Sequence, residues 1–190
     1  HEIKKVDFFL VLTPTPNHYN VLRKLILINA NIIIEKPIVS NLREVQNIKK
    51  ILKNYNSKIY VIHNYIGYPA IREIEQIIKK NNFGKLLHFK LQMTQESFLI
   101  NQLNDQKVKN WRKTDNNIPN IFLDLGVHLF NLSYFLIKEN PISILSNVSK
   151  LNNIVSDAKI LLKYKNNING MFWFSKTSLG NRNNLVIELY

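Results

Sequence analysis

The first third of the chain alternates short apolar runs with stretches whose apolar residues recur every three or four positions. The apolar runs are residues 6–12, 32–35 and 58–63. Their near-continuous hydrophobicity is typical of strands in a parallel sheet, and the stretches between them predict helices. Asn17 is expected to cap the first helix, and Ser40 or Asn41 the second. This order predicts βαβ units in which helices cover both faces of the sheet.

The pattern changes near residue 64. Pro69 is expected to open a third helix. Residues 87–94 then alternate apolar and polar side chains, which predicts a strand with one wet face, as in an open antiparallel sheet. Residues 97–119 are polar and loop-like, and residues 121–138 predict a long helix. Further strands are expected at residues 142–149, 157–164, 168–176 and 184–190.

These patterns predict an α/β plus α+β fold. A partial parallel sheet occupies residues 1–63, and a partial, mostly antiparallel open-sheet domain occupies residues 64–190. Strand-like runs lie close to both ends of the chain. We therefore expect an internal segment of a longer protein.

Composition excludes some classes of protein and site. The chain has no cysteine, which excludes disulfides and thiolate metal sites. It has no apolar run of bilayer length and no basic-then-apolar leader, so we expect a cytoplasmic protein that makes no membrane contact. The net charge of +13 raises nucleic acid as a partner. However, the lysines are scattered and accompany an excess of Asn and Ile, so no specific nucleic-acid partner is expected.

Two polar stretches directly follow predicted parallel strands. They are Thr13-Pro-Thr-Pro-Asn-His18 and Glu35-Lys36-Pro37. Because the carboxyl ends of parallel strands meet at one edge of a sheet, both stretches are expected to border one crevice. A helix N-terminus there favours anions, and a lysine there can polarise a substrate oxygen. The alternatives are a stiff capped turn and an ordinary exit of a strand to solvent.

A third candidate lies on the long helix. Asp124 and His128 are four residues apart, which places them on one helical face among apolar neighbours. The carboxylate can orient the imidazole and raise its basicity, which suits a general base. Gly126 between them indicates a close approach by another group. The alternatives are a buried Asp–His pair and a wet helix edge. No metal site is expected, since a third ligand at suitable spacing is lacking.

Taken in order, the motifs match a known pattern. They are Val6-Asp7, Thr13-Pro14, Asn17-His18, Glu35-Lys36-Pro37, Asn64 with Pro69, Phe83-Gly84-Lys85, Trp111-Arg112 and Asp124-Leu-Gly-Val-His128. This ordered set resembles the Gfo/Idh/MocA family of NAD(P)-dependent sugar and polyol oxidoreductases, and the resemblance covers nearly the whole chain.

The resemblance implies a fold and an activity. Residues 1–63 would be the C-terminal part of an NAD(P)-binding Rossmann domain whose G-x-G-x-x-G half is missing. Residues 64–190 would be a truncated substrate domain whose open sheet mediates homo-oligomerisation. The family transfers hydride between NAD or NADP and a hydroxyl carbon of a sugar, sugar nucleotide or cyclitol. With half of the cofactor site missing, this segment by itself is expected to be inactive.

The resemblance also assigns residues to the site. The catalytic group is Lys36, Asp124 and His128. Cofactor contacts are expected from Thr13, Pro14, Asn17, His18, Glu35, Lys36, Pro37, Trp111 and Arg112. Substrate contacts are expected from Lys36, Asn64, Tyr65, Asp124 and His128. The peptide bond before Pro37 is expected to be cis.

Two departures from the family pattern affect the substrate site. An Asn-x-Arg motif is replaced by Asn64-Tyr65-Ile66, and a Gly-rich run before the long helix is replaced by Ile118-Pro119-Asn120. Two other readings stay open on the same fold. One is an NAD-dependent glycosidase of this family, and the other is a non-catalytic binding or regulatory protein.

Overall fold

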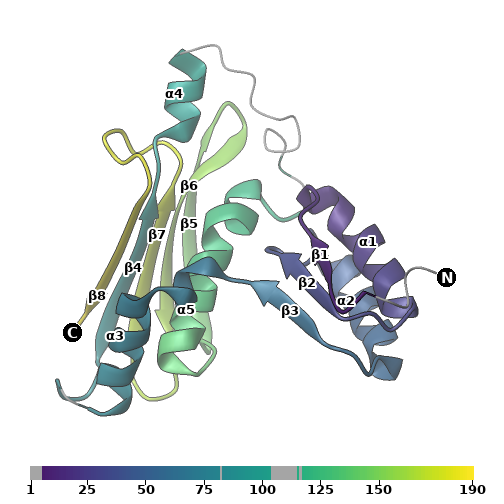
Figure 1. The fold of residues 1–190 in the computed structure, drawn as a ribbon. Coiled ribbons are helices and arrows are strands. Elements are labelled where there is room, and N and C mark those ends of the chain that lie inside the picture. Colours follow the sequence, from purple (N-terminus) through teal and green to yellow (C-terminus); the bar gives the residue numbers. More distant parts are fainter. Residues whose placement is uncertain (1–5, 82, 104–114, 116) are drawn as a thin grey trace. The chain divides into compact units, whose positions relative to one another are not determined.

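The chain forms two compact units, residues 1–63 and 64–190, each with its own hydrophobic core. The structure is a computed structural model that describes residues 6–81, 83–103, 115 and 117–190. A three-stranded parallel sheet lies in the first unit and a five-stranded mixed sheet in the second (Figure 1). This is the two-part α/β plus α+β fold that the sequence predicts.

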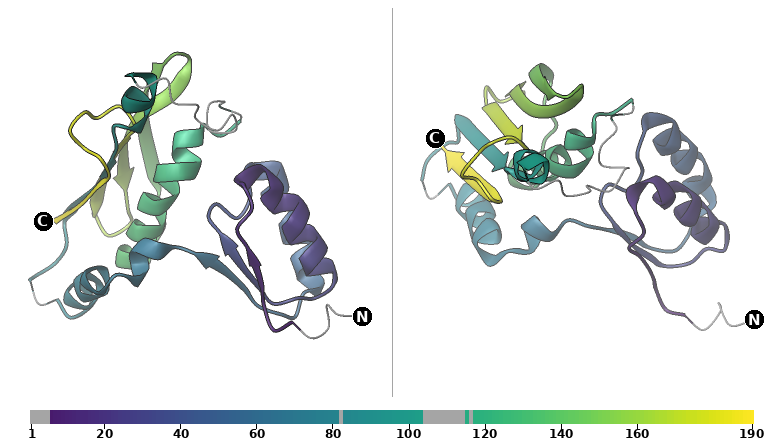
Figure 2. Two further views of the ribbon diagram at one scale, coloured as in Figure 1. Left: turned by 45° about the horizontal axis from the view of Figure 1, so that its top comes forward. Right: turned by 90° about the horizontal axis from the view of Figure 1, so that it is seen from above.

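The first unit is a βαβαβ arrangement. Its elements are β1 (Phe9–Val11), α1 (Thr15–Leu27), β2 (Ile32–Glu35), α2 (Leu42–Ile51), a 3-10 turn η2 (Leu52–Asn54) and β3 (Ile59–Ile62). The strands lie in the order β1-β2-β3 and all pairs are parallel. Because both crossovers advance in the same direction across the sheet, α1 and α2 cover the same face (Figure 2).

Among the described residues, helices cover one face of this sheet, whereas the sequence predicts helices on both faces. The covered face buries Val11, Ile32 and Ile34 against the two helices. On the other face, the side chains of Leu10 and Tyr60 are more than half exposed. The ring of Tyr60 lies beside that of Phe8, with 6.5 Å between the ring centroids. Continuous apolar strands indicated burial on two faces, but the described residues supply a cover for one.

The helix starts of this unit follow local chemistry. The side chain of Asn41 accepts a hydrogen bond from the backbone N–H of Glu44, which confirms it as the cap of α2. The predicted cap Asn17 was wrong, because α1 begins two residues earlier, at Thr15 after Pro14. The rigid ring of Pro16 suits the first helical turn, where its missing N–H costs nothing.

The second unit packs helices on a mixed sheet. Its elements are the 3-10 turn η3 (Asn64–Gly67), α3 (Pro69–Lys79), β4 (His88–Thr94), α4 (Ser97–Leu103), a π-helical turn η5 (Phe122–Gly126), α5 (Val127–Ile137), β5 (Ser143–Leu151), β6 (Ile154–Lys163), β7 (Asn169–Ser175) and β8 (Asn184–Leu189). The strand order is β5-β6-β7-β4-β8, and all neighbours are antiparallel except β4 and β7.

One face of this sheet carries the core and the other is open. On the inner face, Leu91 and Phe172 pack with Leu129 of α5 and are fully buried. On the outer face, Leu161 pairs with Leu145 on one side and Met171 on the other, and all three are exposed. The alternation along β4 and β6 therefore reports this one-sided burial correctly.

Two segments of this unit differ from the sequence prediction. Residues 97–103 form the helix α4, where polar composition predicted a loop. The long helix predicted over residues 121–138 begins as a π-helical turn and becomes α-helical at Val127. A π turn is frequent at functional sites, and this one contains Asp124. In the described part of the chain, no helix has the length and apolar character needed to cross a bilayer.

Candidate active site

Glu35 and Lys36 lie at the carboxyl edge of the parallel sheet of the first unit. Glu35 is the last residue of β2 and pairs with Ile62, the last residue of β3. Lys36 follows at once, is half-buried, and is joined to the buried Pro37 by a cis peptide bond, as the resemblance implies. The edge therefore presents a carboxylate and an ammonium where such sheets hold ligands.

His63 is a member of this edge that sequence reasoning missed. It follows β3, and its Nδ1 is buried with no hydrogen-bond partner among the described residues. Burial lowers the pKa of His63, the charge of Lys36 lowers it further, and Glu35 opposes the shift. The three side chains therefore form one electrostatic cluster. The available signal was positional, because His63 directly follows the third parallel strand, as Lys36 follows the second.

The loop after β1 is braced by His18. Its ring is 1% exposed, its Nδ1 lies 2.8 Å from the carbonyl oxygen of Pro37, and its Nε2 lies 2.7 Å from that of Thr13. The sequence placed His18 among the cofactor contacts. That assignment stays a prediction. Both ring nitrogens face backbone oxygens, so His18 connects the two edge loops from the buried side, whereas Thr13 and Pro14 are exposed.

The residues of this edge fit a dinucleotide. Helix α1 has no acidic residue in its first turn and no side-chain cap at Pro14, so its N-terminal amides are compatible with an anionic group. Leu12, 61% exposed, adds apolar surface next to Thr13. Asn17 is exposed on the first turn of the same helix. Backbone donors, an apolar side chain and the nearby Lys36 are the kinds of group that phosphate, ribose and nicotinamide require.

In the second unit, the π turn places Asp124 close to the sheet. Gly126 lies against the ring of Phe174 on β7, and a Cβ added at Gly126 would lie 3.2 Å from Cζ of Phe174. The expected close approach at this glycine is thus a contact between helix and sheet. Because glycine has no side chain, the backbone of the π turn can pack closely against Phe174, near the end of β7.

Asp124 forms an ion pair with Lys176, which sequence reasoning missed. The Oδ2 atom of Asp124 lies 2.7 Å from Nζ of Lys176. Lys176 is 3% exposed and directly follows β7. Nothing local in the sequence distinguishes Lys176 from the other lysines, since its burial depends on the strand register that brings it under the π turn.

His128 lies in the first turn of α5 and is 8% exposed. The ring of Tyr65 packs edge-on against it, with 4.8 Å between ring centroids. The structure therefore brings together His128 and Tyr65, two residues that the sequence assigned to substrate. Asn64, next to Tyr65, is exposed on the turn η3.

The start of the long helix is fixed by Asp115. One carboxylate oxygen accepts the backbone N–H of Asn120 at 2.8 Å, and the other accepts that of Val155 at 2.7 Å. The Ile118-Pro119-Asn120 segment, which replaces a Gly-rich run, is therefore tied to the start of β6. Trp111 and Arg112, assigned to the cofactor, lie outside the described residues.

The assigned residues divide between the two units. Lys36 belongs to the first unit, whereas Asp124 and His128 belong to the second. Among the residues that the structure describes, no three or more His, Asp or Glu side chains form a group that could hold a metal ion.

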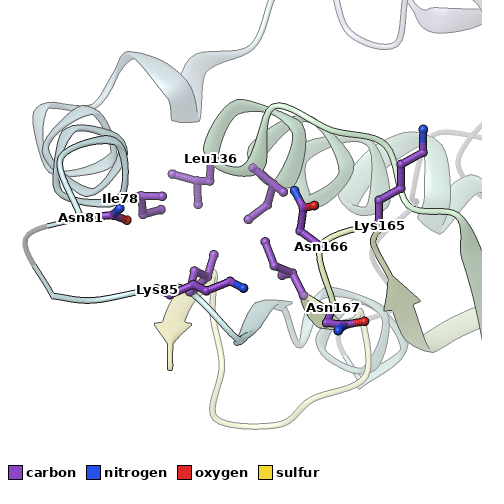
Figure 3. A pocket seen from close by; sticks show the side chains of 10 residues that line it. Ile78, Asn81, Lys85, Leu136, Lys165, Asn166 and Asn167 are labelled. Carbon is purple, nitrogen blue, oxygen red and sulfur yellow. The ribbon is translucent and has the colours of Figure 1, made fainter.

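A hollow of about 410 Å³ lies in the second unit, at the C-terminal ends of α3 and α5 (Figure 3). It is lined by the ends of α3 and α5, by the segment before β4 and by the turn before β7, including Leu136, Lys85 and Asn167. Asp124 and Lys176 lie at the opposite end of β7. The hollow is therefore separate from the residues assigned to catalysis.

Comparison with known proteins supports one family. The family model described as the GFO/IDH/MocA C-terminal domain matches residues 71–190. The model described as the oxidoreductase family with an NAD-binding Rossmann fold matches residues 1–63. The chain is also 23% identical over 185 residues to the uncharacterized oxidoreductase YfiI of Bacillus subtilis, covering 92% of this chain and 47% of that protein.

Solved structures share the fold at lower identity. An inositol dehydrogenase homolog from Azotobacter vinelandii, complexed with NADH and myo-inositol, has a TM-score of 0.83 and 19% identity, over 97% of this chain and 48% of that chain. A levoglucosan dehydrogenase in complex with NADH and levoglucosan has a TM-score of 0.81 and 16% identity, over 97% and 52%.

The chain spans between 37% and 47% of the length of the curated relatives that it matches. The two family models follow one another along it in the same order as its two structural units. The C-terminal model by itself covers most of the chain. The chain therefore belongs to the Gfo/Idh/MocA family of oxidoreductases.

Proposed function

We propose that the protein is an NAD(P)-dependent dehydrogenase acting on a hydroxyl carbon of a sugar, sugar nucleotide or cyclitol. The observation that carries the proposal is the polar pair of Asp124 and His128 on a largely apolar helix, in a chain that also presents Lys36 at a parallel-sheet edge. The substrates named for two structural neighbours, myo-inositol and levoglucosan, support this class of substrate.

In this proposal each side chain has one task. His128 takes the proton from the substrate hydroxyl as general base. Lys36 hydrogen-bonds to the same oxygen and stabilises negative charge there. Asp124 accepts a hydrogen bond and orients the substrate or His128. The nicotinamide, when bound, supplies the hydride chemistry. Thr13, Pro14 and Asn17, exposed at the sheet edge, contact the cofactor.

The test uses protein made from the complete reading frame that encodes these residues. NADH or NADPH formation is followed by absorbance with cyclitols, sugars and sugar nucleotides. We expect Lys36→Ala to reduce turnover by about 100-fold or more with little change in cofactor affinity. Lys53→Ala, at an exposed lysine of the same unit, is the matched control. Equal losses of turnover and cofactor affinity would contradict the role of Lys36.

The same experiment separates the two alternatives. A glycosidase that oxidises and re-reduces its sugar would release product from a glycoside without net formation of NADH. A non-catalytic protein would bind a sugar or the cofactor without any turnover.

The outer face of the second sheet supports a homo-oligomer as a further part of the proposal. Leu145, Leu161 and Met171 form an exposed apolar row across β5, β6 and β7. Contiguous exposed apolar surface is typical of protein–protein contact. A second copy of the chain is the proposed occupant.

A further inference from the structure

We propose that Lys176 is a positioning residue of this site, which holds the Asp124 carboxylate as a fixed hydrogen-bond acceptor for the substrate or for His128. The inference rests on the proposed function. It assigns a role to a buried lysine that the family pattern in the sequence does not include. It also restricts the role of Asp124, because a carboxylate held this way is an acceptor and leaves proton transfer to His128.

The position of Lys176 is fixed by its backbone. Its N–H donates to the carbonyl oxygen of Ser156 at 2.8 Å, and its carbonyl accepts the N–H of Phe98 at 3.0 Å. These bonds tie it to β6 on one side and to α4 on the other. Because the backbone is held on both sides, the direction of the side chain is restricted.

The site lies where two parallel strands end together. β4 and β7 are the parallel pair of the sheet, and their last residues, Thr94 and Ser175, are paired and fully buried. Lys176 follows directly. Thr94, Ser175, Lys176 and Asp124 therefore form a polar cluster at this end of the strand pair, under the π turn. A π turn is frequent at functional sites.

The buried ammonium requires a negative partner. Lys176 is 3% exposed, and its Nζ lies 2.7 Å from Oδ2 of Asp124 and 5.2 Å from the ring centre of Phe98. Removing a charge of this kind from water is costly unless it is paired. The Asp124 carboxylate is the negative partner of this ammonium.

Of the two side chains in this ion pair, that of Asp124 is partly exposed and that of Lys176 is buried. The Asp124 side chain is 26% exposed, whereas that of Lys176 is 3% exposed. A ligand can therefore reach the carboxylate but not the ammonium. Lys176 acts through Asp124, and is not itself a catalytic residue.

The experiment is a double-mutant cycle in protein made from the complete reading frame. Lys176→Met, Asp124→Asn and the double variant are compared for kcat/KM, cofactor affinity and thermal unfolding. We expect each single variant to lose about tenfold or more in kcat/KM, with cofactor affinity within about twofold of wild type. We expect the double variant to lose no more kcat/KM than Asp124→Asn, because Lys176 acts on catalysis only through the Asp124 carboxylate. We expect it to unfold at a higher temperature than Asp124→Asn, because it leaves no buried ammonium unpaired.

Lys159→Met is the matched control. It breaks the Lys159–Asp157 pair of the same sheet, in which the lysine is 63% exposed, and should leave kcat/KM within about twofold of wild type. If Lys176→Met does not fold, Asp124→Asn is compared with the double variant, in which no buried charge is stranded. A further loss of more than about twofold in that comparison overturns the inference.

The remaining outcomes are distinct. Folded Lys176→Met with wild-type kcat/KM, or losses that multiply in the double variant, overturns the positioning role and leaves the proposed function intact. A wild-type protein that oxidises no sugar, sugar nucleotide or cyclitol contradicts the proposed function, and the inference fails with it.

Discussion

The imidazole of His18 connects two loops by lying 2.8 Å from the carbonyl oxygen of Pro37, with its second nitrogen on Thr13. The ring is buried at the base of the sheet edge that carries Lys36. A histidine spans this gap because its two nitrogens point in different directions from one rigid ring. The geometry of the proposed cofactor edge therefore depends on a residue beneath it.

We expect His18→Leu to destabilise the protein and to weaken cofactor binding. The substitution removes the ring N–H that donates to the carbonyl oxygen of Pro37 or of Thr13, which costs about 1–3 kcal/mol in the free energy of unfolding. Chemical denaturation and cofactor titration measure the two effects. Tyr19→Phe is the control, since it removes only the 3.3 Å bond from Asn47 between α1 and α2. Unchanged cofactor affinity in folded His18→Leu would show that the contacts of His18 with Pro37 and Thr13 do not determine the geometry of the cofactor site.

Gly170 is a position where the packing of the second unit leaves no space for a side chain. A Cβ added there would lie 2.7 Å from Cε1 of Phe89 and closer still to its Cζ. Phe89 cannot move aside readily, because it is buried and packs on the rings of Tyr164 and Phe172.

We therefore expect Gly170→Ala to lower the free energy of unfolding by about 1–3 kcal/mol through overpacking. Gly67→Ala is the matched control, as no atom lies within 4 Å of its added Cβ. Equilibrium denaturation of both variants measures the difference. Equal stability of the two variants would mean that Phe89 has an alternative position.

Much of this fold was predictable because burial is periodic in the sequence. The strand at Ile32–Glu35 and the helix capped by Asn41 follow from local pattern and capping chemistry. The open face of the first sheet was not predictable in this way. The continuous apolar strands indicate burial on two faces, but within the described residues both crossover helices lie on the same face, because the strands follow one another in the order β1-β2-β3.

The site was predictable only in part. Lys36, Asp124 and His128 stand out by position and spacing, whereas Lys176 is one of 26 lysine and arginine residues without a local signature. The π turn also has no clear periodic signal in the sequence, since it is a change of helix type over only five residues within an apolar run. Both depend on contacts between β7 and the helix that are distant in sequence.

The excess of asparagine also has a structural use. Among described residues other than glycine, six have positive φ, and five of them are asparagine. They are Asn29, Asn81, Asn152, Asn153 and Asn167. Asparagine tolerates the left-handed region better than most residues. Part of the excess of asparagine therefore lies in the turns of the fold.

The exposed row on the outer sheet predicts self-association. We expect Leu161→Glu to shift the protein from oligomer to monomer at micromolar concentration, because each copy would bury a charge in an apolar contact. Lys163→Glu, two residues along the same strand and face, is the matched control. Sedimentation velocity measures the effect. A wild-type protein that sediments as a monomer at high concentration would refute the proposed interface.

His63 predicts a pH dependence of stability. Burial lowers its pKa below the ordinary value of 6.5, so the unfolded chain binds a proton more readily than the folded protein. Its contribution to stability is present above pH 6.5 and is lost as the pH falls toward the folded pKa. We expect thermal unfolding of His63→Gln to be less sensitive to acidification than that of wild type. His88→Gln, at an exposed histidine, is the control.

The neighbours of His63 predict opposite shifts in its titration. Lys36 lowers the pKa of His63 and Glu35 raises it. We expect Lys36→Met to move the midpoint upward, because a nearby positive charge is removed. Glu35→Gln should move it downward, since the imidazolium loses a favourable carboxylate. NMR titration of the imidazole resonance measures both, with Lys53→Met as the control for a distant charge. A titration midpoint of His63 that moves in the same direction in both variants would contradict the proposed electrostatic interaction of His63 with Lys36 and Glu35.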